Sequence, residues 1–231
     1  MRNKRSFSTK TQNIFFTSDL HLNHGNILKY SRRDKFLSDR DYNELELCQF
    51  DWEANPKYKI SFESISNMNN ALIDNINKIV QKNDILFHLG DFLFAPQNMY
   101  KNDALQFRNK INCKNIYQIW GNHDHDEIYN IFSCDENMME VNIDFQSITL
   151  CHYAMLVWNK SHHGAWHLYG HSHSSLENFA EKVLPNRKSI DVGVDNAYKV
   201  LGEYRPFSFL EIKKIMDSKS GHDTQDHHRK K

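Results

Sequence analysis

The sequence predicts a layered α/β domain built on two sheets, and three observations lead to that fold class. Short apolar runs alternate with amphipathic segments in the first half of the chain, whereas apolar runs follow one another closely in the second half. The apolar runs end on Gly, Asn, Asp or His, which are residues that terminate strands. A chain of 231 residues is long enough to bury the core of one such domain.

The first half of the chain alternates predicted strands with predicted helices. Residues 13–19, 84–91 and 114–124 form short apolar runs that are typical of buried strands. Residues 66–81 carry apolar side chains at helical spacing, and residues 97–110 show a weaker version of the same pattern. Because strand–helix–strand units cross over with a right hand, we expect parallel strands whose carboxyl ends share one edge of the sheet.

The second half of the chain predicts a further set of strands and one closing helix. Residues 141–145 and 147–153 are predicted to be neighbouring strands joined by a very short turn, and residues 166–173 another strand, so we expect antiparallel pairing here. Residues 189–195 predict one more strand. The segment Ser208–Met216 predicts a helix with its first residue as the N-cap.

The polarity of the chain suggests where the domain begins and ends. Residues 1–12 are polar and basic, and residues 217–231 have almost no apolar side chains, so we expect flexible termini around a domain spanning 13–216. Residues 35–64 fit neither the helical nor the strand period, which favours an insertion or cap over the domain.

The composition excludes several classes of function. Lys and Arg number 29 and Asp and Glu number 29, so the formal net charge is zero and argues against broad nucleic-acid binding. No apolar run approaches the roughly 18 residues that span a bilayer, and the first residues lack a secretory signal pattern. The four cysteines form no CxxC pair, which is typical of reduced thiols. We therefore expect a cytoplasmic protein.

Side chains that bind metals follow five of the predicted strands. They are Asp19 and His21, Asp91, Asn122 with His123 and Asp124, His152, and His171 with His173. Ligands of open α/β sheets bind beyond the carboxyl ends of strands, so these groups are expected around one crevice. Residues two apart on an extended strand end would point the same way, which favours chelation by Asp19 with His21 and by His171 with His173.

The kinds of residue in this set indicate which metals would bind. Carboxylates, imidazoles and an amide oxygen without thiolates suit Mn²⁺, Fe, Zn²⁺ or Co²⁺ rather than a cysteine-bound structural zinc. About seven candidate ligands exceed the needs of one ion, and a carboxylate such as Asp91 can bridge two ions. The sequence therefore predicts a two-metal centre.

The same residues fall into five motifs that resemble the signature blocks of the calcineurin-like metallophosphoesterase superfamily, in the same order. The motifs are DLH at 19–21, GD at 90–91, GNHD at 121–124, His152, and GHSH at 170–173. The VGVD stretch at 192–195, followed by a Pro and a late helix, is similar to small bacterial and phage members. The resemblance implies a four-layer αββα sandwich of two mixed sheets flanked by helices.

The resemblance also implies a role for each residue of the motifs. One ion would be held by Asp19, His21 and His173, the other by Asn122, His152 and His171, with Asp91 bridging both. Two divalent cations, Mn first and Fe, Zn, Ni, Co or Mg as alternatives, would polarise a bridging water to hydroxide, which attacks phosphorus in line. The side chain of His123 would face the substrate and protonate the leaving oxygen, with Asp124 orienting its ring.

The expected substrate is a small nucleotide-like phosphodiester. Protein phosphatases of the superfamily read GDxVDRG and RGNHE, whereas this chain has GDFLFAPQ and WGNHD, so the arginine that grips phosphate is missing. A phosphomonoesterase or nucleotidase, and a non-catalytic metal-binding scaffold, remain as alternatives. The presence of His123 favours catalysis over a scaffold, since the related scaffold type lacks that histidine.

Polar residues after the first motif are candidates for contacts with the substrate. We expect His24, Asn26, Arg32 and Arg33 to grip a phosphate or a leaving group. The expected partner is a small phosphoester, with no membrane and no long nucleic acid, and the sequence leaves the oligomeric state open.

Overall fold

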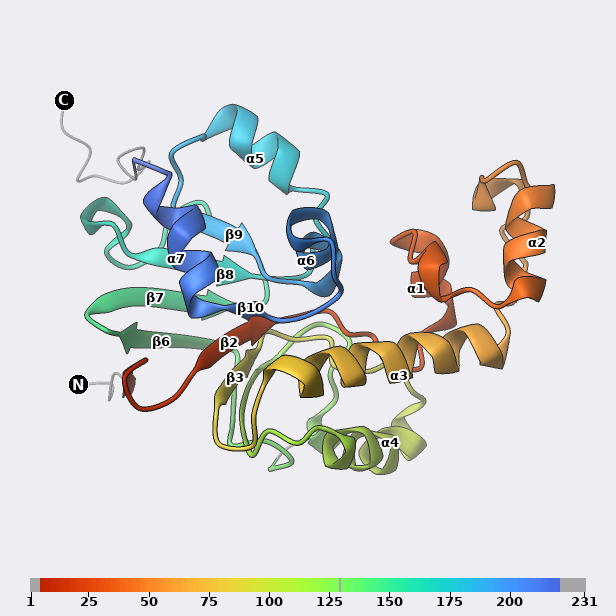
Figure 1. Ribbon diagram of the computed structural model, residues 1–231, viewed down its shortest axis with the longest axis horizontal. Coiled ribbons are helices and arrows are strands. Elements are labelled where there is room, and N and C mark those ends of the chain that lie inside the picture. The colour runs from red at the N-terminus through yellow and green to blue at the C-terminus, as the bar shows by residue number, and fades with distance from the viewer. Residues whose placement is uncertain (1–4, 129, 221–231) are drawn as a thin grey trace.

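Ten strands in the part of the chain that the structure describes form two five-stranded mixed sheets with helices around them (Figure 1). The structure is a computed structural model, and it describes residues 5–128 and 130–220. Both sheets contain parallel and antiparallel pairs. The layered α/β fold that the sequence predicts, two mixed sheets flanked by helices, is therefore confirmed.

The first sheet contains the three strands predicted in the first half of the chain. Neighbouring strands β2, β3 and β4 are parallel, as expected, and place Phe16, Phe87 and Tyr117 in register. The strand order is β10-β2-β3-β4-β5, with β10 antiparallel to β2. The bounds are β2 Ile14–Thr17, β3 Ile85–His88, β4 Asn115–Ile119, β5 Cys134–Glu136 and β10 Phe207–Ser208.

The second sheet differs in part from the expected antiparallel arrangement. Strands β6 and β7 form an antiparallel hairpin across a two-residue turn, as predicted, but β7, β8 and β9 pair in parallel. The stretch between β7 and β8, residues 152–165, is long enough to return the chain to the start of the sheet, which parallel pairing requires. The bounds are β6 Met138–Ile143, β7 Gln146–Cys151, β8 Trp166–Tyr169 and β9 Ser189–Asp191.

The expected flexible start at 1–12 is wrong for the residues of that range that the structure describes. Strand β1, Arg5–Phe7, pairs in parallel with β6 at the edge of the second sheet. The carboxylate of Asp144 then accepts hydrogen bonds from Ser8 and Thr9. Most of the predicted flexible tail, residues 221–231, lies outside the described residues, as do residues 1–4.

Three helices were predicted, and each is present. The longest, α3 (Phe62–Ile79), begins four residues earlier than its apolar pattern because the side chain of Ser61 caps it. Helix α4 (Gln97–Lys110) has the predicted bounds, and α7 (Phe209–Asp217) begins at the predicted cap, Ser208. Shorter helices were not predicted: α1 Gly25–Tyr30, α2 Asp39–Leu47, α5 Glu177–Val183 and α6 Val194–Leu201, with 3₁₀ turns η1 Asp34–Phe36, η2 Trp52–Ala54, η3 Asp126–Ile128 and η4 Ser161–His163.

Successive side chains of a strand point to opposite faces of the sheet, so they pack in two separate apolar cores. Ile14 and Phe16 pack between the two sheets, whereas Phe15 faces the layer formed by α3 and α4. On the outer face of the second sheet, the hydroxyl of Tyr169 hydrogen-bonds Glu177 of α5, and His167 packs against Trp158. None of the described helices has both the length and the apolar character of a membrane span.

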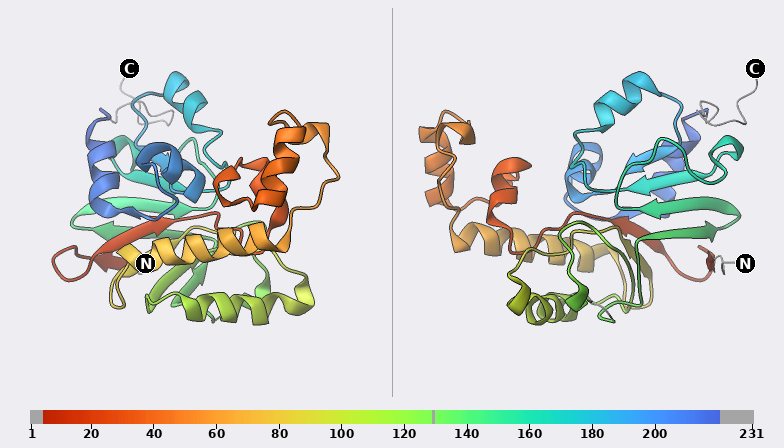
Figure 2. Two further views of the ribbon diagram at one scale, coloured as in Figure 1. Left: turned by 45° about the vertical axis from the view of Figure 1, so that its right-hand side comes forward. Right: turned by 180° about the vertical axis from the view of Figure 1, so that it is seen from behind.

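Residues 35–64 project from the domain as an arm that carries α2 (Figures 1 and 2). The buried carboxylate of Asp41 accepts hydrogen bonds from the side chains of Tyr58, Ser61 and Ser64, and these donors hold its pKa below the usual value although burial opposes ionisation. At the root of the arm, Phe36 packs in the core of the domain. The arm is therefore folded locally and anchored at its base.

The first residues of α7 form a capping box that predicts a pH-dependent contribution to stability. Glu211 accepts from the backbone N–H of Ser208 at 2.8 Å and pairs with Arg205 at 2.7 Å. Burial opposes ionisation, but these donors together lower the pKa of Glu211 from 4.5 to about 2. Since the pKa is lower in the folded state, this stabilisation is present above about pH 4.5 and is lost as the pH falls towards 2.

We expect Glu211→Gln to lower the free energy of unfolding by about 1 kcal/mol at pH 7, measured by urea unfolding. The difference from wild type should shrink at pH 3.5, where the carboxylate is mostly protonated in the unfolded state. Glu203→Gln is the matched control, because Glu203 pairs with the same Arg205 without capping the helix. A loss that is the same at both pH values would contradict the assignment.

Candidate metal centre

The candidate ligands lie in loops that turn sharply after the strands have ended. Five of these residues have a left-handed backbone: Asp19 (φ 57°), His21 (φ 49°), Asp91 (φ 57°), His171 (φ 66°) and His173 (φ 46°). The expectation that strand alternation aligns them is therefore wrong. Left-handed backbone is uncommon for residues other than glycine and is strained, so the surrounding structure has to hold these loops in place.

Two glycines allow the loops after β3 and β4 to touch. A Cβ on Gly121 would overlap the carboxylate of Asp91, and a Cβ on Gly90 would lie 2.5 Å from Nδ1 of His152. Gly90 also has φ of +100°, which side chains disfavour. The close packing of backbone on backbone therefore places Asp91 at the centre of the site.

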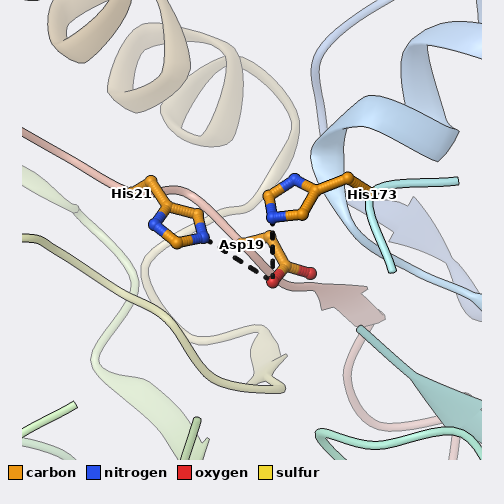
Figure 3. A group of neighbouring side chains, drawn as sticks. All are labelled: Asp19, His21 and His173. Carbon is orange, nitrogen blue, oxygen red and sulfur yellow. Dashed lines mark ion pairs between the residues drawn. The ribbon is translucent and has the colours of Figure 1, made fainter. Parts of the chain in front are cut away.

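The first group of candidate ligands joins the loop after β2 to the loop after β8 (Figure 3). Oδ1 of Asp19 lies 4.0 Å from Nε2 of His21 and 3.9 Å from Nε2 of His173. The three ligand atoms all lie within 4.8 Å of one another, with Asp19 and His21 buried. This spacing leaves room for one cation between them.

The second group lies beside the first and contains Asp91, His152 and His171. Oδ2 of Asp91 is 3.5 Å from Nε2 of His152, and Oδ1 of Asn122 is 3.1 Å from the same nitrogen. The same Asp91 oxygen is 3.4 Å from Nε2 of His21 in the first group. Asp91 thus stands between the two groups.

Two of the histidines donate a hydrogen bond from Nδ1, and this leaves the other ring nitrogen, Nε2, facing the site. Nδ1 of His152 donates to the carbonyl of Leu89 at 2.7 Å, and Nδ1 of His173 donates to Oδ2 of Asp195 at 2.6 Å. Each ring then presents Nε2 to the centre. Such partners commonly orient histidine ligands and raise their basicity.

The electrostatics show a surplus of buried negative charge. Burial raises the pKa of Asp19 to about 7, with Asp191 and Asp91 adding to the rise and His173 and His152 opposing it. Burial disfavours the charged form of His152, but the hydrogen bond and charge of Asp91 outweigh it and raise the pKa of His152 to about 9. The carboxylates therefore draw protons onto the site and would be neutralised equally well by cations.

The residues present fit two divalent cations. Nε2 of His21 is buried without a hydrogen-bond partner, although Asp19 and Asp91 lie near it. The donors are carboxylate, imidazole and amide atoms, which suit Mn²⁺, Fe, Zn²⁺ or Co²⁺. One ion would be held by Asp19, His21 and His173, the other by Asn122, His152 and His171, and Asp91 would contact both.

The side chain of His123 borders a hollow over these groups. The hollow has a volume of about 570 Å³, and its lining includes His21, Asp91, His123 and His173. The backbone N–H of His123 donates to Oδ1 of Asp91 at 2.9 Å, and its ring centroid lies 5.2 Å from that of His21. The ring therefore stands within reach of a group bound above the ligands.

The role expected for Asp124 is corrected by its contacts. Its carboxylate accepts five hydrogen bonds, from the backbone N–H of Asp91, Phe92 and Gly121, from the hydroxyl of Tyr100 and from Nε2 of Gln118. These donors occupy both oxygens and come from two loops, strand β4 and helix α4. Asp124 therefore orients the loop backbones rather than the ring of His123.

Only two of the four residues that were expected to contact substrate line the hollow. His24 and Asn26 line the hollow, and the His24 ring stacks on Phe94 with centroids 4.2 Å apart. Arg32 instead pairs with Asp34 on the surface. Arg33 is fully buried, so the expectation that it grips a phosphate is wrong.

Arg33 and Asp195 are the residues whose role sequence reasoning missed. The guanidinium of Arg33 makes two 2.8 Å bonds to the carboxylate of Asp195 and also donates to the carbonyls of Asp19 and Leu20. Asp195 in turn holds His173. The two adjacent arginines look alike in the sequence, and the only signal for Asp195 was its place in VGVD at 192–195.

We expect Asp195→Asn to weaken binding of the ion at Asp19, His21 and His173 by about 10- to 100-fold, because His173 loses the anion that orients it. Calorimetric titration of the chelated protein with Mn²⁺ measures both sites. Asp34→Asn breaks the neighbouring surface pair with Arg32 and is the control that should bind both ions normally. Equal weakening of both sites by Asp195→Asn would argue for a general loss of structure.

Comparisons with known proteins identify the family of the chain. A sequence model described as calcineurin-like phosphoesterase matches residues 12–182, a range that contains every candidate ligand. An uncharacterized protein of Methanocaldococcus jannaschii is 27% identical over 206 residues, which are 88% of this chain and 91% of that protein. The crystal structure of a protein of unknown function from Aquifex aeolicus has a TM-score of 0.57 and is 20% identical in sequence. The match covers 88% of this chain and 99% of that protein, and it shows a similar fold. Because the family match extends over most of the chain, the chain belongs to the calcineurin-like phosphoesterase family.

Proposed function

We propose that the protein is a metal-dependent phosphodiesterase that hydrolyses small, singly charged phosphodiesters. The observation that carries the proposal is the convergence of carboxylates and imidazoles from five loops beneath an open hollow that His123 borders. Bound divalent cations would supply Lewis acidity to a phosphoryl oxygen and to water. Mn²⁺ is the first metal to test, because a mixed carboxylate and imidazole site accepts it.

The charge of the hollow supports a diester over a monoester. Among the described residues, no lysine or arginine lines it, and Arg33 is buried outside its lining. A phosphomonoester carries up to two negative charges near neutral pH, whereas a diester carries one. Beside the bound cations, the hollow offers no lysine or arginine for a second negative charge, which favours the substrate with the smaller charge.

Asp91, His123 and His24 would each contribute to hydrolysis in a different way. The carboxylate of Asp91 fixes the backbone of His123 through its N–H, which sets where the ring stands. The ring of His123 holds a proton for the leaving oxygen. Stacking against Phe94 holds His24 at the wall of the hollow, where it can donate to a phosphoryl oxygen.

The first test compares bis-p-nitrophenyl phosphate with p-nitrophenyl phosphate after chelation and re-addition of Mn²⁺, Ni²⁺, Zn²⁺ or Mg²⁺. We expect metal-dependent cleavage with a higher kcat/KM for the diester. Asp91→Asn should remove activity together with most of the bound metal, because Asp91 faces both ligand groups. Preference for the monoester would point to a phosphomonoesterase, and no turnover with both ions bound would point to a scaffold.

The second test concerns His123. We expect His123→Ala to retain both ions and to lower kcat by about 10²- to 10⁴-fold if the ring acts as a general acid. His125→Ala is a matched control, because His125 lies two residues further on and does not line the hollow. Loss of a bound ion in His123→Ala, measured by metal analysis, would instead make His123 a ligand.

A further inference from the structure

A second hollow adjoins the one described above, and the two meet at the metal ligands. The first hollow, called the α1 hollow, includes residues of α1, Phe94 and His123 in its lining. The second, called the α5 hollow, has a volume of about 690 Å³ and is lined by Tyr153, Leu176 and Phe179 among others. Four residues line both: His171, Ser172, His173 and Ser175. A phosphate at the ligand groups would therefore have one open space on each side.

Each hollow carries exposed aromatic side chains. In the α1 hollow, Tyr30 is 72% exposed and Phe94 is 45% exposed. In the α5 hollow, Phe179 is 64% exposed and Tyr153 is 47% exposed, with its ring 4.9 Å from that of His171. Large apolar rings left open to solvent beside a binding site are platforms on which a flat group can stack.

The elements that supply these rings come from different parts of the fold. Tyr30 ends α1, just before the projecting arm, whereas Phe179 lies in α5 over the second sheet. The two helices lie apart from each other in Figure 1 and in the right-hand view of Figure 2. A substrate that uses both rings must therefore extend across the ligand groups in two directions.

Both hollows also contain small polar side chains that can hydrogen-bond a ligand. Asn26 and Ser31 lie in the α1 hollow, and Ser172 and Ser175 are shared with the α5 hollow. In the described part of the chain, neither hollow is lined by a lysine or an arginine. Such walls can hydrogen-bond the edge of a base, but they offer no cation to a second phosphate.

Building on the proposed phosphodiesterase activity, we infer that the substrate class is a dinucleoside monophosphate, with one base in each hollow and its single phosphodiester at the ligand groups. The volumes of both hollows lie within the range of small-molecule sites. Hydrolysis consumes one water, whose oxygen forms a new bond to phosphorus while the P–O bond to one nucleoside breaks. The departing oxygen takes a proton by way of His123, which leaves a nucleoside and a nucleoside monophosphate.

The test compares three phosphodiesters on the metal-loaded protein. They are a dinucleoside monophosphate with two adenines, the methyl ester of adenosine monophosphate with one adenine, and bis-p-nitrophenyl phosphate. We expect kcat/KM for the two-base substrate to exceed that for the one-base substrate by at least about 5-fold, which is the lower end of one base–aromatic stack. The one-base ester carries the same charge, so charge cannot cause the difference.

Substitution of the platforms tests the two hollows separately. Tyr30→Ala and Phe179→Ala should each lower kcat/KM for the two-base substrate by about 5- to 150-fold, mainly by raising KM. With the one-base ester, only one of the two variants should show such a loss, because one hollow stays empty. Phe145→Ala removes a ring that is 99% exposed in the turn between β6 and β7 and is the matched control.

The outcomes separate this inference from the proposed activity. Cleavage of bis-p-nitrophenyl phosphate without preference for the two-base substrate would overturn the inference and leave the phosphodiesterase in place. The same holds if Tyr30→Ala and Phe179→Ala behave like Phe145→Ala. Failure to cleave any diester would overturn both proposals.

Discussion

The carboxylate of Asp124 is the interaction on which the arrangement of the site depends. It gathers backbone N–H groups from the loop after β3 and from the loop after β4, and both loops carry candidate ligands. These N–H groups have no strand partners, so without Asp124 they would be buried and unsatisfied. One half-buried carboxyl group therefore positions Asp91 and the Asn122–His123 pair together, which explains why a carboxylate follows this histidine directly.

A second buried network joins the projecting arm to the ligands. Arg33 lies immediately before η1, where the arm begins, and it binds Asp195 of α6 and the carbonyls of the first ligand loop. Asp195 also holds His173. Because a buried ion pair is costly to break, the root of the arm, α6 and one ligand move as a unit. Tyr30, which lines the α1 hollow, lies three residues before Arg33 and is linked to this network through the chain.

Much of the fold and the membership of the site could be predicted from the sequence, because both leave strong local signals. Apolar runs that end on polar residues identified β2, β3, β4, β7 and β8, and the same endings identified the candidate ligands. Strand β1 gave no such signal, since its pairing depends on β6 more than 130 residues away. Arg32 is on the surface and Arg33 is buried, and the sequence does not show which of two adjacent arginines is buried. The left-handed backbone at Asp19 and His173 depends likewise on contacts between loops distant in sequence.

The left-handed backbone of the ligand loops also affects how the protein responds to substitutions in its core. Each such residue costs on the order of 1 kcal/mol, and five of them together are a sizeable share of the about 5–15 kcal/mol that holds a typical domain folded. The loops keep this conformation only while the sheets beneath them stay tightly packed. A cavity opened between the sheets, for example at Phe16 or Leu150, would therefore relax the loops before the domain unfolds. Such a protein would keep its fold and lose its metal site, so the site would report on the integrity of the core between the sheets.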